Sequence, residues 1–332
     1  MDLYPLTFEP QYLPKIWGGR KMETLLGRPL PPGPGVGESW ELCDRPGRES
    51  VVAAGALKGA TLHQVFLEYG PRLVGRPVFD RAPARFPLLV KILDAAEDLS
   101  VQVHPGDDYA ALHGGPDETG KTEAWALLQA DPGARVIAGL KPGIGRDEWK
   151  AALAGGDPTR VLNRFEAKEG DAVFVPAGRV HAVGKGCLVA EVQQNSDTTY
   201  RVWDWGRLED GRPRELHPRQ ALETIRFDAE MAGMPDRQPQ KLLRGDDFQH
   251  AVLAQCQHFT LERVWVDPLF RPGRVPESFH ILMGFRGRGL LRRRSGPDLT
   301  LEPGRTVLVP ASVEDWRVER QGAECQVLWT RI

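Results

Sequence analysis

The chain has 332 residues and a formal net charge of −2, with 43 Lys and Arg against 45 Asp and Glu. So small a net charge offers no global field to nucleic acid or an anionic membrane surface. No apolar run approaches the roughly 20 residues of a membrane span. We therefore expect no nucleic-acid partner and no membrane partner. The first residues lack a signal-peptide pattern and the four cysteines form no CxxC pair, which together predict a cytoplasmic protein with reduced thiols.

Most of the chain reads as short strands separated by Gly and Pro, a pattern typical of sandwiches and barrels. Thr61 is a predicted helix N-cap, followed by apolar residues that share one helix face. A zone of about 106–165 interrupts the β pattern, and we interpret it as a helical insertion into a first β-domain. The expected helices lie at 61–69, 107–113, 146–153, 158–165 and 217–227.

The segment 170–181 is the most informative stretch of the chain. It reads Gly, five residues, Pro, one residue, Gly, two residues, His. Residues 173–175 form a predicted strand, Pro176 and Gly178 a predicted turn, and His181 enters the next strand. A strand, a turn and a His of this kind aim an imidazole at the interior of a small β-barrel. The spacing resembles the second signature motif of the cupin superfamily, whose His is a metal ligand.

A weaker copy of this motif lies at 304–315. Its Gly and Pro keep their spacing, but Ser312 and Asp315 stand where the first copy has Gly178 and His181. We interpret the copy as a second cupin-like barrel without a metal ligand, an internal repeat of fold.

These patterns predict the fold class and the domains. The fold is expected to be mostly β, with two cupin-like β-barrels or jelly rolls (a bicupin) and a helical insertion in the first. We expect a catalytic cupin domain at 1–235 and a C-terminal cupin-like domain without metal ligands at 236–332.

Several Lewis bases upstream of His181 suit a metal site. The strand ending at His104 alternates, so Gln102 and His104 point to one face together with Ser100. Glu123 begins an apolar strand, where an acid is costly unless it is paired or bound to a metal. A single His in a β-rich protein is more often a surface residue than a ligand, but His104 and His181 each occupy a matching strand-and-turn setting. Two imidazoles, one carboxylate and an amide oxygen suit Zn²⁺ with a position left open.

A second polar cluster follows in the sequence. Glu191 and Gln193 share one face of a predicted strand, and Arg201 enters an aromatic strand after a turn. Two explanations of Arg201 are open: a structural ion pair with Asp197 or Asp204, or an arginine that binds phosphate or stabilises an oxyanion. No P-loop or Rossmann glycine pattern is present, so we expect no nucleotide.

In combination these segments resemble the type I, zinc-dependent mannose-6-phosphate isomerases of the cupin superfamily, in their short bacterial form. The matching pieces cover about the first 230 residues in order, and the remainder matches only in general character. The segments that carry the resemblance are Pro14-Lys-Ile-Trp-Gly-Gly19, Gly37-Glu-Ser-Trp-Glu41, Phe86-Pro-Leu-Leu-Val-Lys-Ile-Leu93, Leu99-Ser-Val-Gln-Val-His-Pro105, Gly120-Lys-Thr-Glu-Ala-Trp125, Val175-Pro-Ala-Gly-Arg-Val-His181 and 191–201.

The resemblance implies one zinc ion per chain and an isomerase that interconverts mannose 6-phosphate and fructose 6-phosphate through a cis-enediol. The partner would be a small sugar phosphate. The implied zinc ligands are His104, Glu123, His181 and Gln102, the substrate-binding residues Ser100 and Lys121, and the catalytic residues Arg201 and Glu191. Short members of the family can hold the metal mainly through two His and one Glu, with Gln102 as an additional ligand. Whether Glu191 or a metal-bound water carries the proton stays open.

Three other functions are compatible with the same residues. Two His and a carboxylate are also the ligand set of non-haem iron oxygenases, although an extra Gln ligand and the Lys and Arg argue against that class. A non-catalytic sugar-binding cupin would bind sugar without turnover. An isomerase of relaxed specificity would also accept unphosphorylated sugars.

Overall fold

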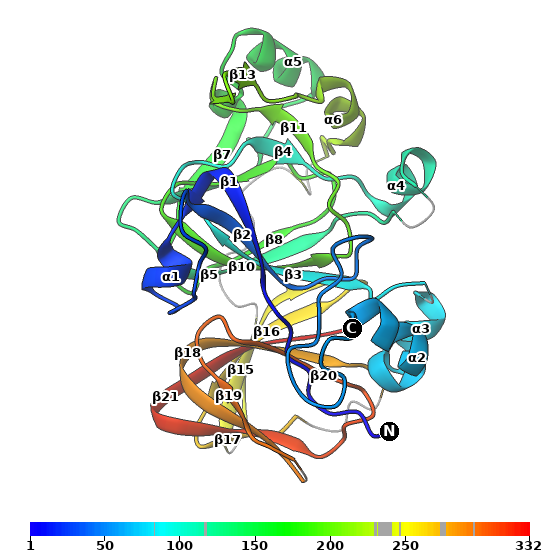
Figure 1. The fold of residues 1–332 in the computed structure, drawn as a ribbon. Helices are drawn as coiled ribbons and strands as arrows, with labels where there is room; N and C mark the ends of the chain where they lie inside the picture. The colour runs from blue at the N-terminus through cyan, green and yellow to red at the C-terminus, as the bar shows by residue number, and fades with distance from the viewer. Residues whose placement is uncertain are drawn as a thin grey trace. The chain divides into compact units, whose positions relative to one another are not determined.

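The structure is a computed structural model, shown as a ribbon in Figure 1. It describes residues 1–82, 84–115, 118–228, 231, 241–245, 247–272, 277–294 and 296–332, with 241–244 described by their backbone only.

The predicted predominance of β-structure is confirmed, since 42% of the chain is strand and 16% is helix. The strands are β1 (Gln11–Gly19), β2 (Val36–Leu42), β3 (Leu88–Asp94), β4 (Val101–Val103), β5 (Glu123–Ala130), β6 (Arg135–Leu140), β7 (Leu162–Glu166), β8 (Ala172–Val175), β9 (His181–Val183), β10 (Cys187–Gln194), β11 (Tyr200–Trp203), β12 (Leu208–Glu209), β13 (Arg212–Pro213), β14 (Lys241–Arg244), β15 (Phe248–Gln255), β16 (Thr260–Val266), β17 (Leu269–Phe270), β18 (His280–Arg293), β19 (Leu299–Leu301), β20 (Thr306–Val309) and β21 (Trp316–Arg331).

The helices are short, and none of those described is long and apolar enough to cross a membrane. They are α1 (Lys21–Thr24), α2 (Leu62–Val74), α3 (Arg76–Arg81), α4 (Asp107–His113), α5 (Arg146–Ala154), α6 (Pro218–Thr224) and the 3₁₀ helix η1 (Pro158–Val161). Thr61 caps α2 as predicted, because its hydroxyl accepts from the backbone N–H of Gln64 while the Gln64 side chain accepts from the N–H of Thr61.

The helix predicted at 158–165 is wrong beyond its first turn. Asp157 caps only the short η1, and the chain then continues as strand β7, which pairs antiparallel with β6. The pairing places Phe165 opposite Val136 and Arg164 opposite Ile137. A distant strand therefore takes the backbone hydrogen bonds that a helix would have satisfied locally.

The zone 106–165 holds α4, α5 and η1, but it also contributes β5, β6 and most of β7 to the sheets. A helical insertion is therefore not confirmed. The strand pairings in the described part of the chain form open sheets, and no closed barrel is found there.

The chain folds as two compact units, each assembled from separate segments. We call one the terminal unit (Met1–Gln11, Trp40–Lys91 and Gln238–Ile332) and the other the central unit (Tyr12–Ser39 and Ile92–Arg237). The predicted boundary at 235/236 lies outside the described residues, so the division into a catalytic and a C-terminal domain stays a prediction.

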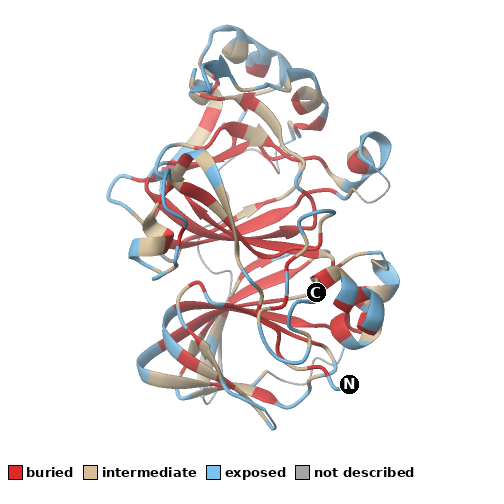
Figure 2. Ribbon diagram, viewed as in Figure 1, coloured by how far each residue is buried: buried red, intermediate tan, exposed pale blue. Residues whose placement is uncertain are grey.

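In the central unit, two sheets enclose one apolar interior. One sheet has the order β11-β4-β9-β6-β7, and strands β10, β5 and β8 belong to the other. Most residues of these strands are buried, as the red colouring in Figure 2 shows, and apolar residues of both sheets form one buried cluster. The shared cluster includes Trp125, Leu127, Val173, Val175 and Val189 from the second sheet and Val136, Ala138 and Val183 from the first.

The motif at 170–181 forms the predicted strand, turn and strand. Strand β8 ends at Val175, and Gly178 turns the chain with a φ of 87°, a backbone region that favours glycine. His181 then begins β9. In the terminal unit, β20 and the start of β21 at Trp316 frame the weaker copy, within a sheet of order β14-β15-β16-β21-β18-β19.

Candidate metal centre

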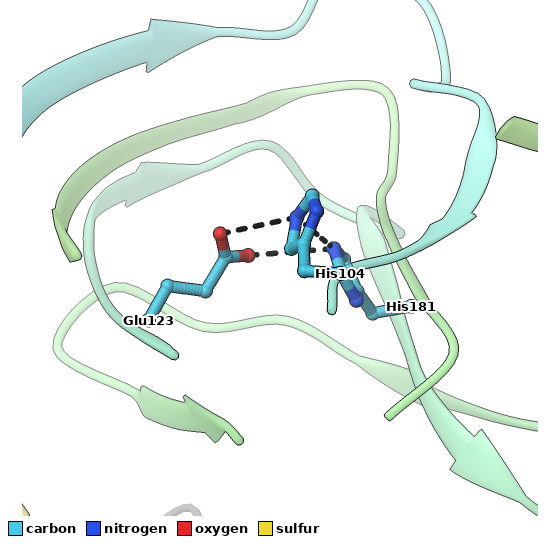
Figure 3. Close-up of side chains that lie close together, drawn as sticks. All are labelled: His104, Glu123 and His181. Carbon is cyan, nitrogen blue, oxygen red and sulfur yellow. Dashed lines mark hydrogen bonds and ion pairs between the residues drawn. The ribbon is translucent and has the colours of Figure 1, made fainter. Parts of the chain in front are cut away.

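Three buried side chains of the central unit meet at one point (Figure 3). His104 follows β4, Glu123 begins β5 and His181 begins β9. The two imidazole Nε2 atoms lie 3.1 Å apart. The Glu123 carboxylate places Oε2 3.2 Å from His104 Nε2 and Oε1 3.4 Å from His181 Nε2. No more than 1% of any of the three residues is exposed.

Sheet register explains why these residues converge. Gln102 lies opposite His181 in the pairing of β4 with β9, and His104 shares the Gln102 face two residues on. In the other sheet, Glu123 continues the inward row of Trp125 and Leu127 beyond the apolar cluster. Each sheet thus brings polar residues to one end of the shared interior.

Backbone carbonyls fix the orientation of both imidazoles. His104 Nδ1 lies 3.0 Å from the carbonyl oxygen of Thr198, and His181 Nδ1 lies 2.8 Å from that of Arg179. A carbonyl only accepts hydrogen bonds, so each Nδ1 carries the proton and each Nε2 directs a lone pair at its neighbour.

The electrostatics of the site keep its histidines neutral and its carboxylate charged. Burial lowers the pKa of His104 to about 3 and also lowers the pKa of His181. Burial raises the pKa of the Glu123 carboxyl, but the adjacent Lys121 favours the charged form, and the net effect holds that pKa well below its usual range. Lys121, itself buried, places Nζ 3.2 Å from His104 Nε2 and 3.6 Å from Glu123 Oε2.

This donor set fits a divalent metal ion. Two neutral Nε2 lone pairs 3.1 Å apart cannot hydrogen-bond to each other, and Glu123 Oε2 is buried with no hydrogen-bond partner among the residues that the structure describes. Such groups are stabilised by a shared cation. Two imidazoles and a carboxylate, with both imidazoles oriented from behind by carbonyls, are typical of a metal site.

Gln102 and Ser100 lie beside this centre, as the sequence predicts. The Gln102 amide nitrogen lies 3.3 Å from His181 Nε2, and its Oε1 accepts a 3.4 Å hydrogen bond from the Ser100 hydroxyl. In this orientation the amide nitrogen of Gln102, not its oxygen, faces the His181 ring.

Trp125 is a site residue that the sequence reasoning missed. Its indole N–H lies 3.0 Å from Glu123 Oε1 and 3.0 Å from Glu191 Oε1. Glu191 lies directly opposite Trp125 in the pairing of β10 with β5. The available signal was the spacing of Trp125 two residues after Glu123, which places both on one strand face.

Arg201 lies opposite Gln102 in the pairing of β11 with β4, and Gln102 in turn lies opposite His181 in the pairing of β4 with β9. Its Nη1 donates to the carbonyl of Glu215 at 2.7 Å, and its buried Nε has no hydrogen-bond partner in the described part of the chain. Burial, with repulsion from Arg214, lowers the pKa of its guanidinium. Within the described residues Arg201 forms no ion pair, so the structural pair with Asp197 or Asp204 is not found; Asp204 pairs instead with Arg207 and Arg214.

Known proteins of similar sequence and fold share one family. Residues 6–125 match the family model described as phosphomannose isomerase type I, catalytic domain. The chain is 35% identical over 329 residues to mannose-6-phosphate isomerase ManA of Bacillus subtilis, covering 98% of this chain and 99% of the relative. It is 38% identical over 259 residues to the mannose-6-phosphate isomerase of Streptococcus mutans, covering 77% of each.

A solved structure agrees with the sequence relatives. The crystal structure of the Bacillus subtilis mannose 6-phosphate isomerase superposes with a TM-score of 0.86 at 32% identity, covering 99% of both chains. Similarity of this extent includes the strands that carry His104, Glu123 and His181. The chain therefore belongs to the type I phosphomannose isomerases.

Proposed function

We propose that this chain interconverts mannose 6-phosphate and fructose 6-phosphate with the help of one bound zinc ion. The observation that carries the proposal is the buried convergence of two imidazole nitrogens and one carboxylate in a chain of this isomerase family. A proton must leave the carbon next to a carbonyl in this reaction, so the site must stabilise the enediolate that forms.

His104, Glu123 and His181 would hold the zinc, with Gln102 as the fourth ligand. Nitrogen and oxygen donors in a buried site support zinc. Gln102 would have to turn its amide so that Oε1 faces the centre, which is consistent with its place opposite His181. A bound zinc ion supplies Lewis-acid stabilisation of negative charge on the sugar oxygens.

Glu191 and Arg201 would carry the proton chemistry. Glu191 is buried and held by the indole N–H of Trp125, so its carboxylate is fixed in place to accept or return a proton. Arg201 keeps its charge at any working pH, so it suits stabilisation of an anion better than proton transfer. Its unpartnered Nε leaves a donor for the substrate.

Lys121 and Ser100 would bind the phosphate end of the substrate. Lys121 is a buried ammonium at the centre, and Ser100 is a buried hydroxyl two residues before Gln102. Binding energy from the phosphate would orient the reacting carbons at the other end of the sugar.

We also infer the domain architecture of the chain. It would be a bicupin, with a catalytic domain at 1–235 that contains a helical insert and a C-terminal domain at 236–332 without metal ligands. The strand-turn-strand units that end at His181 and precede Trp316 support this reading. A cytoplasmic setting is supported by the four free cysteines, Cys43, Cys187, Cys256 and Cys325.

A coupled assay on mannose 6-phosphate with zinc-replete protein tests the function. We expect isomerisation with phosphorylated substrate and far slower turnover of free mannose. If the zinc-replete protein does not isomerise mannose 6-phosphate, the proposal is wrong. Oxygen uptake in parallel identifies an iron oxygenase, and sugar binding without turnover identifies a non-catalytic cupin.

A further inference from the structure

A pocket lies in the central unit, on the outer face of the sheet β11-β4-β9-β6-β7. Its volume is about 430 Å³, within the range of ~300–1,000 Å³ that is usual for small-molecule sites. Ile137 and Ala182 line it and lie opposite each other in the pairing of β6 with β9. Because neighbours along a strand point to opposite faces, Ala182 faces this pocket while His181 faces the metal centre. The two sites are therefore separated by the sheet.

Two guanidinium groups of this pocket have no carboxylate partner among the described residues. Arg164 lies opposite Ile137 in the β6–β7 register, and Arg135 shares the Ile137 face two residues earlier. Both are exposed, and neither forms an ion pair with any carboxylate that the structure describes, although Glu166 lies opposite Arg135 in the register. Arg135 and Arg164 thus give the pocket two unpaired positive charges.

The other charged residues of the pocket are already engaged. Asp131 pairs with Lys21 at 2.8 Å, and hydrogen bonds from Lys21 and Gln129 lower the pKa of its carboxyl. Asp98 accepts from the backbone N–H of Lys185 at 2.7 Å, and Lys185 itself pairs with Glu97 at 2.7 Å. The carboxylates of Asp98 and Asp131 nevertheless stand at the pocket with lone pairs that hydroxyl groups can use.

Trp205 supplies an aromatic wall in an unusual backbone conformation. Its φ is 61°, a left-handed value that residues with a Cβ rarely adopt. The indole N–H donates to the carbonyl of Leu99 at 2.8 Å, and the ring packs on Trp203 with centroids 4.4 Å apart. The Arg164 guanidinium lies 5.9 Å from the Trp205 ring centroid. The fold therefore holds an indole and a guanidinium together at this pocket.

We propose that this pocket binds a small phosphorylated sugar, as a site separate from the metal centre. Arg135 and Arg164 bind the phosphate, because a planar guanidinium donates two parallel hydrogen bonds to phosphate oxygens. The Trp205 indole packs against the apolar face of the sugar ring. Asp98 and Asp131 accept from sugar hydroxyls and repel further phosphates, which favours a sugar monophosphate over a nucleoside di- or triphosphate.

Equilibrium dialysis of the full zinc-loaded chain with fructose 6-phosphate tests this site, counting both isomers of the ligand. We expect the double variant Arg135→Ala/Arg164→Ala to bind one ligand fewer per chain than the wild type. The matched control is Arg160→Ala, which removes an exposed arginine of the same unit that pairs with Asp157 and should leave the count unchanged. Equal counts in the wild type and the double variant overturn the proposal.

The double variant should bind one ligand fewer than the wild type whether or not the metal centre binds the sugar phosphate. A failure of the isomerase proposal can therefore be distinguished from a failure of the proposed second site. The double variant should also keep the wild-type kcat and KM for mannose 6-phosphate. A raised KM would place the two arginines in the active centre and overturn the claim of a separate site.

The Trp205→Gly variant tests the ring contact without adding backbone strain, because glycine adopts a φ of 61° freely. We expect it to weaken sugar-phosphate binding at this pocket about tenfold and to leave the binding of inorganic phosphate unchanged. Inorganic phosphate that binds as tightly as the sugar phosphate, or an unchanged affinity in Trp205→Gly, would show an adventitious ion site only and overturn the proposal.

Discussion

Glu123 and Glu191 share one hydrogen-bond donor, the indole N–H of Trp125, which lies 3.0 Å from an oxygen of each carboxylate. The proposed metal ligand and the proposed proton carrier are therefore joined through a single buried side chain. A donor shared by two carboxylates both orients them and offsets part of their mutual repulsion.

Replacing Trp125 by Phe should weaken metal binding by about 10- to 100-fold, the usual cost of losing a partner that orients a ligand. The ring stays buried, so the fold should persist. Competition with a chromophoric chelator measures the affinity. Trp149→Phe is the matched control, because Trp149 is fully buried on α5 of the same unit and should leave metal affinity unaltered. Equal affinities for both variants would contradict the role of Trp125.

His181→Ala and Glu123→Ala should each lose the metal, and so should the isosteric Glu123→Gln, which removes the charge but keeps the shape. Metal content after dialysis measures this by elemental analysis. Glu209→Gln, at an exposed position of the same unit, should retain full metal content. A Glu123→Gln protein with wild-type metal content would exclude Glu123 as a ligand.

Removing the metal with a chelator should lower the melting temperature of the wild type but not that of Glu123→Gln. An ion that binds only the folded state stabilises it by about 4 kcal/mol at a thousandfold excess over its Kd. Differential scanning calorimetry with and without chelator measures the effect. An identical drop in both proteins would show that the metal is held elsewhere.

Arg201→Ala should keep its metal and lose turnover by about 10²- to 10³-fold, because removing a donor to a developing anion costs about that much. Steady-state kinetics together with metal analysis check both halves of this prediction. Arg219→Ala, an exposed arginine of α6 paired with Glu223, is the control and should retain activity. If Arg201→Ala keeps most of its activity, its proposed role is wrong.

The terminal unit should lose stability on acidification because of His280. Burial lowers the pKa of His280 to about 4, while in the unfolded chain it is about 6.5. Between these values the unfolded state binds more protons than the folded state. The contribution of His280 to the free energy of unfolding is therefore complete above about pH 6.5 and is lost as the pH falls toward 4. His280→Gln, which can still accept from Trp329 Nε1, should flatten the dependence of unfolding free energy on pH in this window. Urea unfolding at several pH values measures it, and an unchanged dependence in His280→Gln would contradict this role of His280.

The candidate metal ligands could be predicted from the sequence alone. The residue types and spacings around His104, Glu123 and His181 predict a metal site, and the structure brings these three side chains together. Thr61 likewise predicts the start of α2 from its own side chain and that of Gln64. These features are local, because strand alternation and helix capping act over a few residues.

Features that depend on strands far apart in the chain could not be predicted from the sequence. Residues 162–166 form a strand because β6 lies beside them. Trp125 meets Glu191 because β10 pairs with β5 in one register. Arg201 lies opposite Gln102, and within the described residues it forms no ion pair with its sequence neighbours Asp197 and Asp204. The pocket at Arg135 and Arg164 has no sequence motif at all. Register between strands far apart in the chain is set by the packing of whole faces, and no short stretch of sequence contains that information.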